Sequence, residues 1–197
     1  MTYGLAIHTS SPDLGLALDD FCGHARSRHL DLGRAISNQI HSQLAQFLQP
    51  QRWEDLAFIA VAIGPGSFTG TRIGVVLART LAQQLDIPLY GISSFAAIAQ
   101  HHAPDSTLAI EMPAQRGSLF TALYQNTRAI LEDGVMPPEA WQHTRQTHPD
   151  FPHHQAAPLQ GKYAPELLAI AYPRYQKGDR PTWETALPYY GQHPVVF

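Results

Sequence analysis

The chain has little charge, little lysine and almost no cysteine. Only two of its 13 basic residues are lysines, and its formal net charge is −3. A protein that holds nucleic acid through bulk charge needs a clustered positive field, so this class is excluded. Charged residues make up 15% of the chain, against about 25% in an average domain, and such a weakly charged surface is compatible with a face for a partner protein.

Membrane and secretion signals are also missing from the sequence. The longest apolar run, residues 56–63, is far shorter than the ~20 residues that span a bilayer. The first eleven residues lack the basic segment of a signal peptide. The single cysteine, Cys22, excludes an internal disulfide and a cysteine-rich zinc site. We therefore expect a cytoplasmic protein that has no contact with a membrane.

Glycine and proline divide the sequence into two unlike halves. Nine of the 14 glycines lie before residue 100, and 12 of the 16 prolines lie after it. The distribution predicts a first lobe over residues 1–103, built of regular strands and helices. It predicts a smaller, proline-rich second lobe over residues 104–197.

The first half predicts five strands and three helices. The strands are expected at residues 3–9, 14–21, 24–29, 57–63 and 88–92, and the helices at 31–48, 71–85 and 94–100. Asp31 is expected to complement the dipole at the start of the first helix. Three leading strands joined by tight turns should be antiparallel, whereas the later strand–helix–strand units should be parallel. This order predicts an α/β fold of the ribonuclease-H-like type that actin-like ATPases use, with two lobes, a mixed sheet and flanking helices.

The second half predicts shorter elements. Two paired strands are expected at residues 108–112 and 119–124, around the turn Gln115-Arg116-Gly117. A short helix is expected at 138–145, and a second helix at 165–172 that Pro173 ends. The run Glu132-Asp133-Gly134 is interpreted as an ordinary turn.

A glycine-rich run at residues 64–74, GPGSFTGTRIG, follows a buried strand and opens a helix. Backbone N–H groups at a helix start attract phosphate, which predicts an anion or nucleotide site. The candidate contacts are Gly64, Gly66, Ser67, Thr69, Gly70 and Arg72. The run is not a Walker loop, a dinucleotide fingerprint or a nucleophile elbow. The alternative is that the glycines permit a tight strand-to-helix turn against the sheet. Arg72, expected in the first helical turn, indicates either a nearby carboxylate or phosphate or simple exposure.

Five segments together resemble the TsaB (YeaZ) family. They are GPGSFTGTRIG at 64–74, LAIHTSS at 5–11, IPLYGISS at 87–94, residues 108–120 around Arg116-Gly117, and LPYY at 187–190. The resemblance covers the first hundred residues well and the rest thinly. It implies a non-catalytic subunit of the bacterial machinery that makes threonylcarbamoyladenosine next to the anticodon of tRNA.

The same resemblance implies partners. They are TsaD, as a heterodimer, and the ATPase TsaE, with tRNA reached only through the complex. The isolated protein is expected to form a homodimer. No cofactor of its own is implied, and ATP or ADP is expected only in the assembled complex.

The sequence departs from the family pattern at two places. His8 stands where the family has an aspartate in its first strand, and imidazole is a poor ligand for Mg²⁺. Tyr190-Gly191-Gln192 replaces Tyr-Leu-Arg, and the compact second lobe puts a role for that lobe in doubt. The chain also lacks the helical His-x-x-x-His of TsaD-like enzymes. No residue is therefore predicted to be catalytic or to bind a metal.

Two alternative functions remain open at this point. A free-standing ATPase or kinase of the same fold would need acidic Mg²⁺ ligands that the sequence does not offer. A peptidase would need a nucleophile and base, such as Ser67 with His8 or His29, and no spacing supports that pair.

The paired histidines at 101–102 and 153–154 are interpreted as solvated loop residues.

The helix expected at residues 71–85 is apolar over an arc of ~200°, where a surface helix needs ~100°. One stripe holds Ile73, Leu77, Leu81 and Leu85, and a second stripe holds the small residues. Either the helix is sandwiched inside its lobe, or the larger stripe packs on the sheet and the small one meets a partner. The resemblance implies that two helices of this lobe pair with TsaD. The predicted interface residues are Ile36, Ile40, Gly74, Val75, Ala78 and Ala82.

Overall fold

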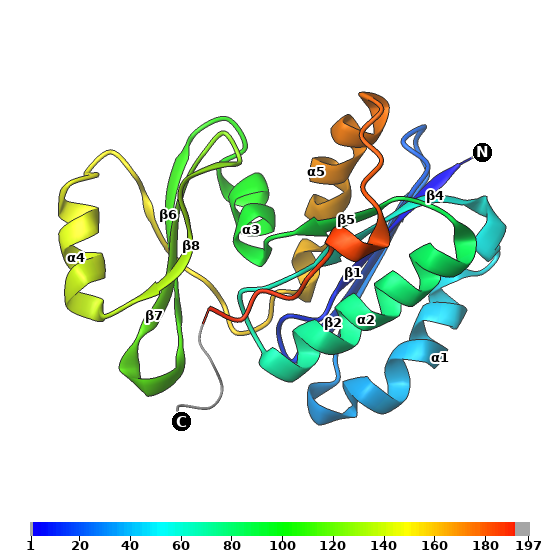
Figure 1. Cartoon of the computed structure of the whole chain (residues 1–197), viewed down its shortest axis with the longest axis horizontal. Helices are drawn as coiled ribbons and strands as arrows, with labels where there is room; N and C mark the ends of the chain where they lie inside the picture. Colours follow the sequence, from blue (N-terminus) through cyan, green and yellow to red (C-terminus); the bar gives the residue numbers. More distant parts are fainter. Residues whose placement is uncertain (1, 192–197) are drawn as a thin grey trace.

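A five-stranded mixed sheet forms the centre of the first lobe (Figure 1). The computed structural model describes residues 2–191. The strands are Tyr3–His8 (β1), Asp13–Asp19 (β2), Ala25–Asp31 (β3), Leu56–Ala62 (β4) and Leu89–Ile92 (β5). Their order in the sheet is β3-β2-β1-β4-β5. The strands β1, β2 and β3 pair antiparallel, whereas β4 and β5 run parallel to β1. The predicted topology is confirmed.

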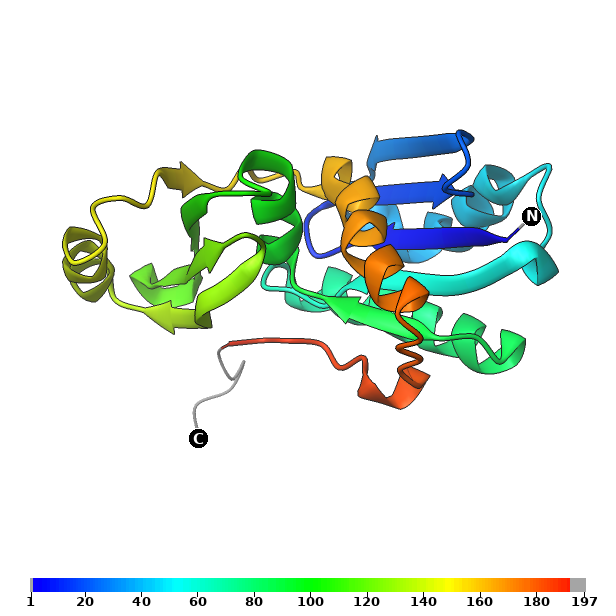
Figure 2. The same cartoon turned by 90° about the horizontal axis from the view of Figure 1, so that it is seen from above.

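Helices cover both faces of this sheet (Figures 1 and 2). They are Ile36–Leu48 (α1) and Phe68–Leu85 (α2) on one face and Ala164–Gln176 (α5) on the other, and Ser94–His102 (α3) packs on α5. Side chains alternate along β1, so Leu5 and Ile7 pack toward α1 and α2 while Ala6 packs toward α5. No helix within residues 2–191 combines the length and apolarity needed to cross a membrane.

A four-stranded sheet forms the second lobe. Its strands are Thr107–Pro113 (β6), Leu119–Gln125 (β7), Arg128–Met136 (β8) and His153–Gln155 (β9), in the order β8-β7-β6-β9. The strands β6 and β7 pair antiparallel, as predicted. The helix Pro138–Gln146 (α4), also predicted, packs Trp141 against this sheet. The helix α3 lies between the two sheets (Figure 1).

Five short 3₁₀ turns connect these elements: Gly33–Ala35 (η1), Trp53–Asp55 (η2), Gln115–Gly117 (η3), Gly161–Tyr163 (η4) and Trp183–Thr185 (η5). The first of them corrects one prediction. Asp31 ends β3 instead of capping a helix, and α1 begins after η1 with no side-chain cap. The chain needs this extra turn to cross from the edge strand to the helix layer.

The helix α2 begins three residues earlier than predicted. The Ser67 hydroxyl accepts a hydrogen bond from the Gly70 N–H at 3.2 Å, so Ser67 is the cap and Phe68 the first helical residue. Arg72 therefore lies beyond the first turn. A capping serine inside a glycine-rich run was not read as a helix start.

Pro173 lies inside α5 and does not end it, contrary to the prediction. Proline removes one helical hydrogen bond, but aromatic packing holds the last turn in place. The ring of Tyr172 stacks on that of Phe21, with their centroids 3.6 Å apart, and the ring centroids of Tyr175 and Phe58 are 5.0 Å apart. Tertiary contacts thus outweigh a local helix breaker.

The run Glu132-Asp133-Gly134 belongs to strand β8 and is not a turn. The turn that joins β7 to β8 lies at Asn126 and Thr127, which both have positive φ. Asparagine tolerates that conformation better than most residues do. The acidic-glycine pattern was therefore assigned to the wrong place in the hairpin.

The chain returns to the first sheet after β9. The helix α5 packs against β1, β2 and β4, and η5 contacts α2. Figure 2 shows α5 lying across the strands of the first sheet. The boundary between residues 103 and 104 stays a prediction of where the second lobe begins. Residues 161–186 lie after this boundary but outside the second sheet, because α5 and η5 pack on the first lobe.

Candidate functional site

The six predicted interface residues face the interior of their own lobe. Ile36 and Ile40 are 6% and 1% exposed, and Val75, Ala78 and Ala82 are at most 1% exposed. Gly74 is buried too, because Thr9 of the neighbouring loop occupies the space that its side chain would fill. The burial of these side chains contradicts their prediction as an exposed interface, although Ile40 also lines the groove described below.

The small residues of α2 face the sheet for a physical reason. The strand β4 presents the bulky side chains Ile59 and Val61 to this helix. A helix can approach such a surface closely only with small or compact side chains, and Ala78 and Ala82 supply them. An apolar arc of ~200° does not determine which stripe faces inward. The larger stripe was expected on the sheet, whereas the small residues pack there.

The other stripe of α2 lies on the surface beside α1. Val76 is 60% exposed, and Ile73 and Leu77 are half-buried. Together with Ile40 and His41 of α1 they line a groove of about 400 Å³. Among residues 2–191 only three large apolar side chains are exposed, and Val76 is the most exposed of them. We call this surface the helix groove; its remaining lining residues are Ser37, Arg72 and Thr80.

The glycine-rich loop is closed on the turn between β1 and β2. A side chain at Gly66 would overlap the Ser10 carbonyl oxygen, and one at Gly70 would overlap the Thr9 carbonyl oxygen. The Ser67 N–H donates to the Ser10 carbonyl at 2.6 Å, and the Thr9 hydroxyl donates to the Gly70 carbonyl at 2.8 Å. These glycines therefore permit close packing of the chain on itself, which is the alternative that the sequence left open.

The six candidate loop residues do not gather at one place. Gly66 and Ser67 line a cleft between the two sheets. Gly64 lies under the Tyr189 carbonyl oxygen, and Gly70 is buried. Thr69 is exposed outside the cleft lining. Arg72 lines the helix groove, with its guanidinium 5.3 Å from the Phe68 ring centroid.

The interlobe cleft has a volume of about 360 Å³. Its walls come from the β1–β2 turn, the glycine loop, the β6–β7 turn and the segment before η4. The lining residues are Ser10, Ser11, Pro12, Gly66, Ser67, Phe68, Met112, Pro113, Ala114, Gln115, Phe120, Pro158, Gln160 and Tyr190. None of these lining residues carries a charge. Mg²⁺ prefers carboxylate and phosphate oxygens, so the described walls do not fit a magnesium nucleotide.

His8 does not line this cleft. It is fully buried, and within residues 2–191 neither ring nitrogen has a hydrogen-bond partner. Burial lowers the pKa of His8 to about 4, so the ring is neutral at physiological pH. A neutral, enclosed imidazole cannot supply the charge that the family aspartate would.

Replacing His8 with leucine is expected to stabilise the protein. At pH 7 the gain should be about 1–2 kcal/mol, because two unpaired polar atoms leave the core. The unfolded histidine titrates near pH 6.5 and the folded one near 4. The natural protein therefore loses stability as pH falls through this window, and the advantage of His8→Leu should grow toward pH 5.

Urea unfolding of both proteins at pH 7 and pH 5 measures this difference. The exposed His143 of α4 provides the control, since His143→Leu should change stability by less than about 0.5 kcal/mol. A His8→Leu protein that is less stable at both values of pH would contradict the prediction.

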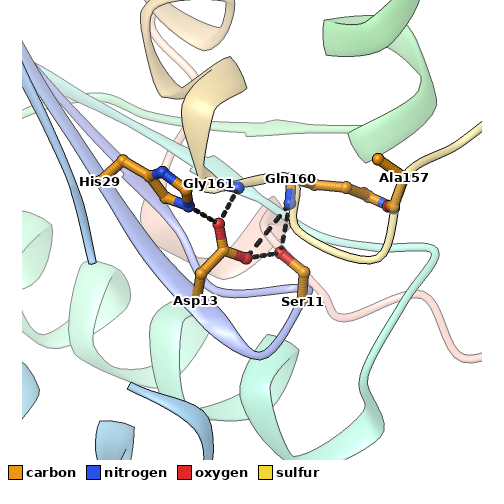
Figure 3. Close-up of polar contacts among 6 residues, drawn as sticks. All are labelled: Ser11, Asp13, His29, Ala157, Gln160 and Gly161. Atoms are coloured by element: carbon orange, nitrogen blue, oxygen red, sulfur yellow. Dashed lines mark hydrogen bonds and ion pairs between the residues drawn. The ribbon is translucent and has the colours of Figure 1, made fainter. Parts of the chain in front are cut away.

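Asp13 forms a densely bonded polar centre (Figure 3). It is fully buried, and its carboxylate accepts hydrogen bonds from the Ser11 hydroxyl and the His29 ring. The backbone N–H groups of Gln160 and Gly161 donate to it at 3.2 and 2.7 Å. The carboxylate thus sits at the start of the helical segment formed by η4 and α5, where a negative charge is favourable.

The Asp13 centre fixes the returning segment onto the first sheet. A side chain at Gly15 would overlap the Gly161 carbonyl oxygen, so the two backbones lie directly against each other. In the sequence Asp13 lies between the strands expected at residues 3–9 and 14–21, and nothing there indicates this contact. Its partner backbone lies 148 residues away in the chain.

The serine, histidine and acid of this centre are not ordered as a hydrolase triad. Such a triad needs the histidine between the serine and the acid. Here Ser11 and His29 both bond to Asp13, and not to each other. Ser67 caps α2, and His8 has no partner within residues 2–191. The described residues therefore do not bring together the pairs that the peptidase alternative needs.

Asp133 anchors a second polar centre, in the place read as a turn. Its carboxylate accepts from the Ser93 hydroxyl at 2.5 Å and the Tyr124 hydroxyl at 2.9 Å. The Tyr189 hydroxyl donates to the Asp133 carbonyl at 2.7 Å. Burial raises the pKa of Asp133 to about 6. Because Ser93 caps α3, this centre joins the second sheet, the linking helix and the C-terminal segment.

Four of the eleven histidines meet other side chains where the two lobes join. His101 and His102 end α3, and the ring of His102 lies 4.2 Å from that of His154. The His102 ring also bonds to the Tyr163 hydroxyl at 3.0 Å, and His153 pairs with Glu111 at 2.8 Å. The pairs therefore lie in α3 and β9 and not in loops, but His101, His102 and His153 are exposed, as expected. Over residues 2–191 no three His, Cys, Asp or Glu side chains are placed to hold a metal ion.

Two lobes, a β3-β2-β1-β4-β5 sheet and a cleft beside a glycine loop define the class: the fold is actin-like. The family described as "TsaD: tRNA N6-adenosine threonylcarbamoyltransferase" matches residues 33–176. The chain belongs to the TsaB (YeaZ) branch of this family.

Relatives of known name support this assignment. Over 137 residues the chain is 39% identical to "tRNA threonylcarbamoyladenosine biosynthesis protein TsaB" of Bacillus subtilis, a match covering 66% of this chain and 58% of that protein. Over 114 residues it is 31% identical to the Escherichia coli protein of the same name, covering 55% and 46%. The chain thus matches about half the length of these relatives.

Solved structures confirm the fold over nearly the whole chain. "YeaZ from Pseudomonas aeruginosa" superposes with a TM-score of 0.76 at 24% identity, covering 96% of this chain and 100% of that one. A second structure, titled as an uncharacterized protein with similarity to peptidase YEAZ from the same organism, gives 0.78 at 23% identity, covering 98% and 100%. At such identities the likeness is one of fold.

Proposed function

We propose that this protein is a non-catalytic scaffold subunit of the machinery that makes threonylcarbamoyladenosine in tRNA. It binds TsaD through the helix groove between α1 and α2. The observation that carries the proposal is the apolar surface left uncovered there, with Val76 60% exposed. The names of the relatives, which are tRNA threonylcarbamoyladenosine biosynthesis proteins, supply the pathway.

The composition of the helix groove suits a protein partner. Its centre is apolar, with Ile73, Val76 and Leu77, and its rim is polar, with His41 and Arg72. Protein interfaces combine a largely uncharged centre with a polar rim, and arginine is enriched in them. Arg72 is therefore better explained as an interface residue than as an anion contact.

The other partners follow from the same proposal. TsaE engages the pair formed with TsaD, and tRNA is reached only through the assembled complex, as is ATP or ADP. A second copy of this chain covers the groove in a homodimer when TsaD is absent. The cytoplasmic location stays a prediction of the sequence.

A charge in the middle of the groove tests the proposal. We expect Val76→Glu to weaken association with TsaD from the same organism at least tenfold, because a carboxylate would be desolvated in the interface without a partner. Since Val76 is 60% exposed, the lobe should fold normally. Isothermal titration calorimetry measures the affinity, and circular dichroism checks the fold.

A matched control is available on the other lobe. Ile130 of β8 is 52% exposed, and Ile130→Glu adds the same charge far from the helix groove. We expect it to bind TsaD as the unchanged protein does. A folded Val76→Glu protein with full affinity would refute the groove as the interface.

A further inference from the structure

The walls of the interlobe cleft are not built for a nucleotide. A nucleoside triphosphate needs cations or a metal ion to offset its phosphates. None of the lining residues is charged. The Arg72 guanidinium lies over the Phe68 ring and lines the helix groove, and Arg116, which follows Gln115 in the chain, is not among the lining residues.

The glycine loop also lacks the space that a phosphate would use. In phosphate loops glycines leave room for the ligand to approach the backbone. Here the Ser10 carbonyl oxygen fills that space at Gly66, and the Thr9 carbonyl oxygen fills it at Gly70. The Ser67 N–H is engaged by Ser10 at 2.6 Å. A phosphate that approached the backbone at Gly66 would therefore meet the Ser10 carbonyl oxygen, which repels it.

We propose that this cleft binds an uncharged, flat ligand of the nucleoside class and discriminates against its phosphorylated forms. The inference does not depend on the helix groove or on TsaD. The cleft is a separate surface, because no residue lines both the cleft and the helix groove.

The cleft offers flat apolar surfaces to such a ligand. The ring centroids of Phe68 and Tyr190 lie 4.5 Å apart, and their ring planes meet at 41°. Both residues are half-buried. Phe120 and Met112 face the same cleft from the second sheet. Aromatic side chains stack on any base, because every base has a flat π-face. A volume of about 360 Å³ lies within the range of small-ligand sites, which is about 300–1,000 Å³.

The polar groups of the cleft suit the edges of a neutral base. The Ser67 hydroxyl accepts from the Gly70 N–H, so its own hydrogen is left to donate. Gln115 is exposed at the rim and offers one amide acceptor and two donors. Such groups read a base edge without supplying net charge.

Calorimetric titration of the full chain with adenosine, cytidine, AMP and ATP, with and without Mg²⁺, tests the proposal. We expect the nucleosides to bind with micromolar to millimolar dissociation constants. AMP and ATP should bind at least tenfold more weakly. Binding of ATP as tight as that of adenosine would overturn the proposal, as would absence of nucleoside binding at millimolar concentration.

Substitutions at two positions, Tyr190 and Gln115, test whether the ligand binds in this cleft. Tyr190→Ser removes a stacking ring and should weaken adenosine binding at least fivefold, whereas Tyr190→Phe keeps the ring and should restore it. Gln115→Arg adds a cation at the exposed rim and should strengthen AMP binding at least fivefold with adenosine unchanged. If neither Tyr190→Ser nor Gln115→Arg changes affinity, the ligand binds elsewhere and the proposal fails. Val76→Glu should leave nucleoside binding intact, which separates this test from that of the proposed function.

Discussion

Replacing Asp13 with alanine is expected to cost about 3–5 kcal/mol of stability, the range seen when one partner of a buried charged network is removed. For a chain of this length 1 kcal/mol corresponds to about 2–4 °C. The melting temperature should therefore fall by roughly 6–20 °C. Thermal and urea unfolding followed by circular dichroism measure both quantities.

The expected loss is large because four donors depend on one carboxylate. Ser11, His29 and the N–H groups of Gln160 and Gly161 all donate to Asp13. Asp13 is fully buried, so water cannot easily replace it for these donors. The helical segment that begins at Gly161 also loses the negative charge that complements its dipole. Amides of α5 should therefore exchange hydrogen faster in the variant, more than those of α1.

Asp31 provides a matched control for this substitution. It pairs with Asp13 across β2 and β3 but is exposed, so Asp31→Ala should change stability by less than about 0.5 kcal/mol. The prediction is contradicted if Asp13→Ala lowers stability no more than Asp31→Ala does. In that case the Asp13 centre would not be what holds η4 and α5 on the first sheet.

The parts of the fold that follow from local patterns were predictable from sequence. The first three strands are separated by tight turns, and the apolar positions of α1 repeat at helical spacing. These features led to the correct order of elements along the chain, to antiparallel pairing of β1, β2 and β3, and to parallel pairing of β4 and β5. The hairpin of β6 and β7 was found for the same reason, because its turn carries the local chemistry at residues 115–117.

The orientation of α2 could not be read from its sequence. Both stripes of this helix are apolar, so periodicity alone does not tell the inward face from the outward one. What decides is the shape of the opposing strand: Ile59 and Val61 of β4 leave room only for the compact stripe. The prediction used the buried stripe of α2, whereas the exposed apolar side chain of this helix, Val76, lies on the other stripe.

The two acidic centres were missed because their partners are distant in the chain. Asp13 bonds to backbone 147 and 148 residues away, and Asp133 bonds to Ser93, 40 residues earlier. In sequence each looks like a turn residue beside glycine, serine or proline. Only the folded chain shows that Asp13 is buried, that Asp133 is half-buried, and that both carboxylates accept several hydrogen bonds.

Asp133 is expected to make stability fall as pH rises. Its folded pKa, about 6, is above the unfolded value of 3.8, so the folded protein binds this proton more tightly than the unfolded chain does. The stabilisation is complete below pH 3.8 and is lost as pH rises through 6. Two units of difference correspond to about 2–3 kcal/mol.

Asp133→Asn should remove this dependence, because the amide is neutral at every pH and can still bond to Ser93 and Tyr124. The stability of the variant relative to the natural protein should therefore rise by about 2–3 kcal/mol between pH 4 and pH 7.5. Urea unfolding at several values of pH gives the difference, in which the other titrating groups cancel.

The neighbouring Glu132 is exposed on the same strand, and Glu132→Gln should show a nearly constant difference over the same range. A constant difference for Asp133→Asn as well would mean that the carboxylate is ionised in the folded protein as readily as in the unfolded chain. In that case Ser93 and Tyr124 would stabilise the charge as strongly as burial opposes it, and the Asp133 centre would hold the lobes together without any dependence on pH.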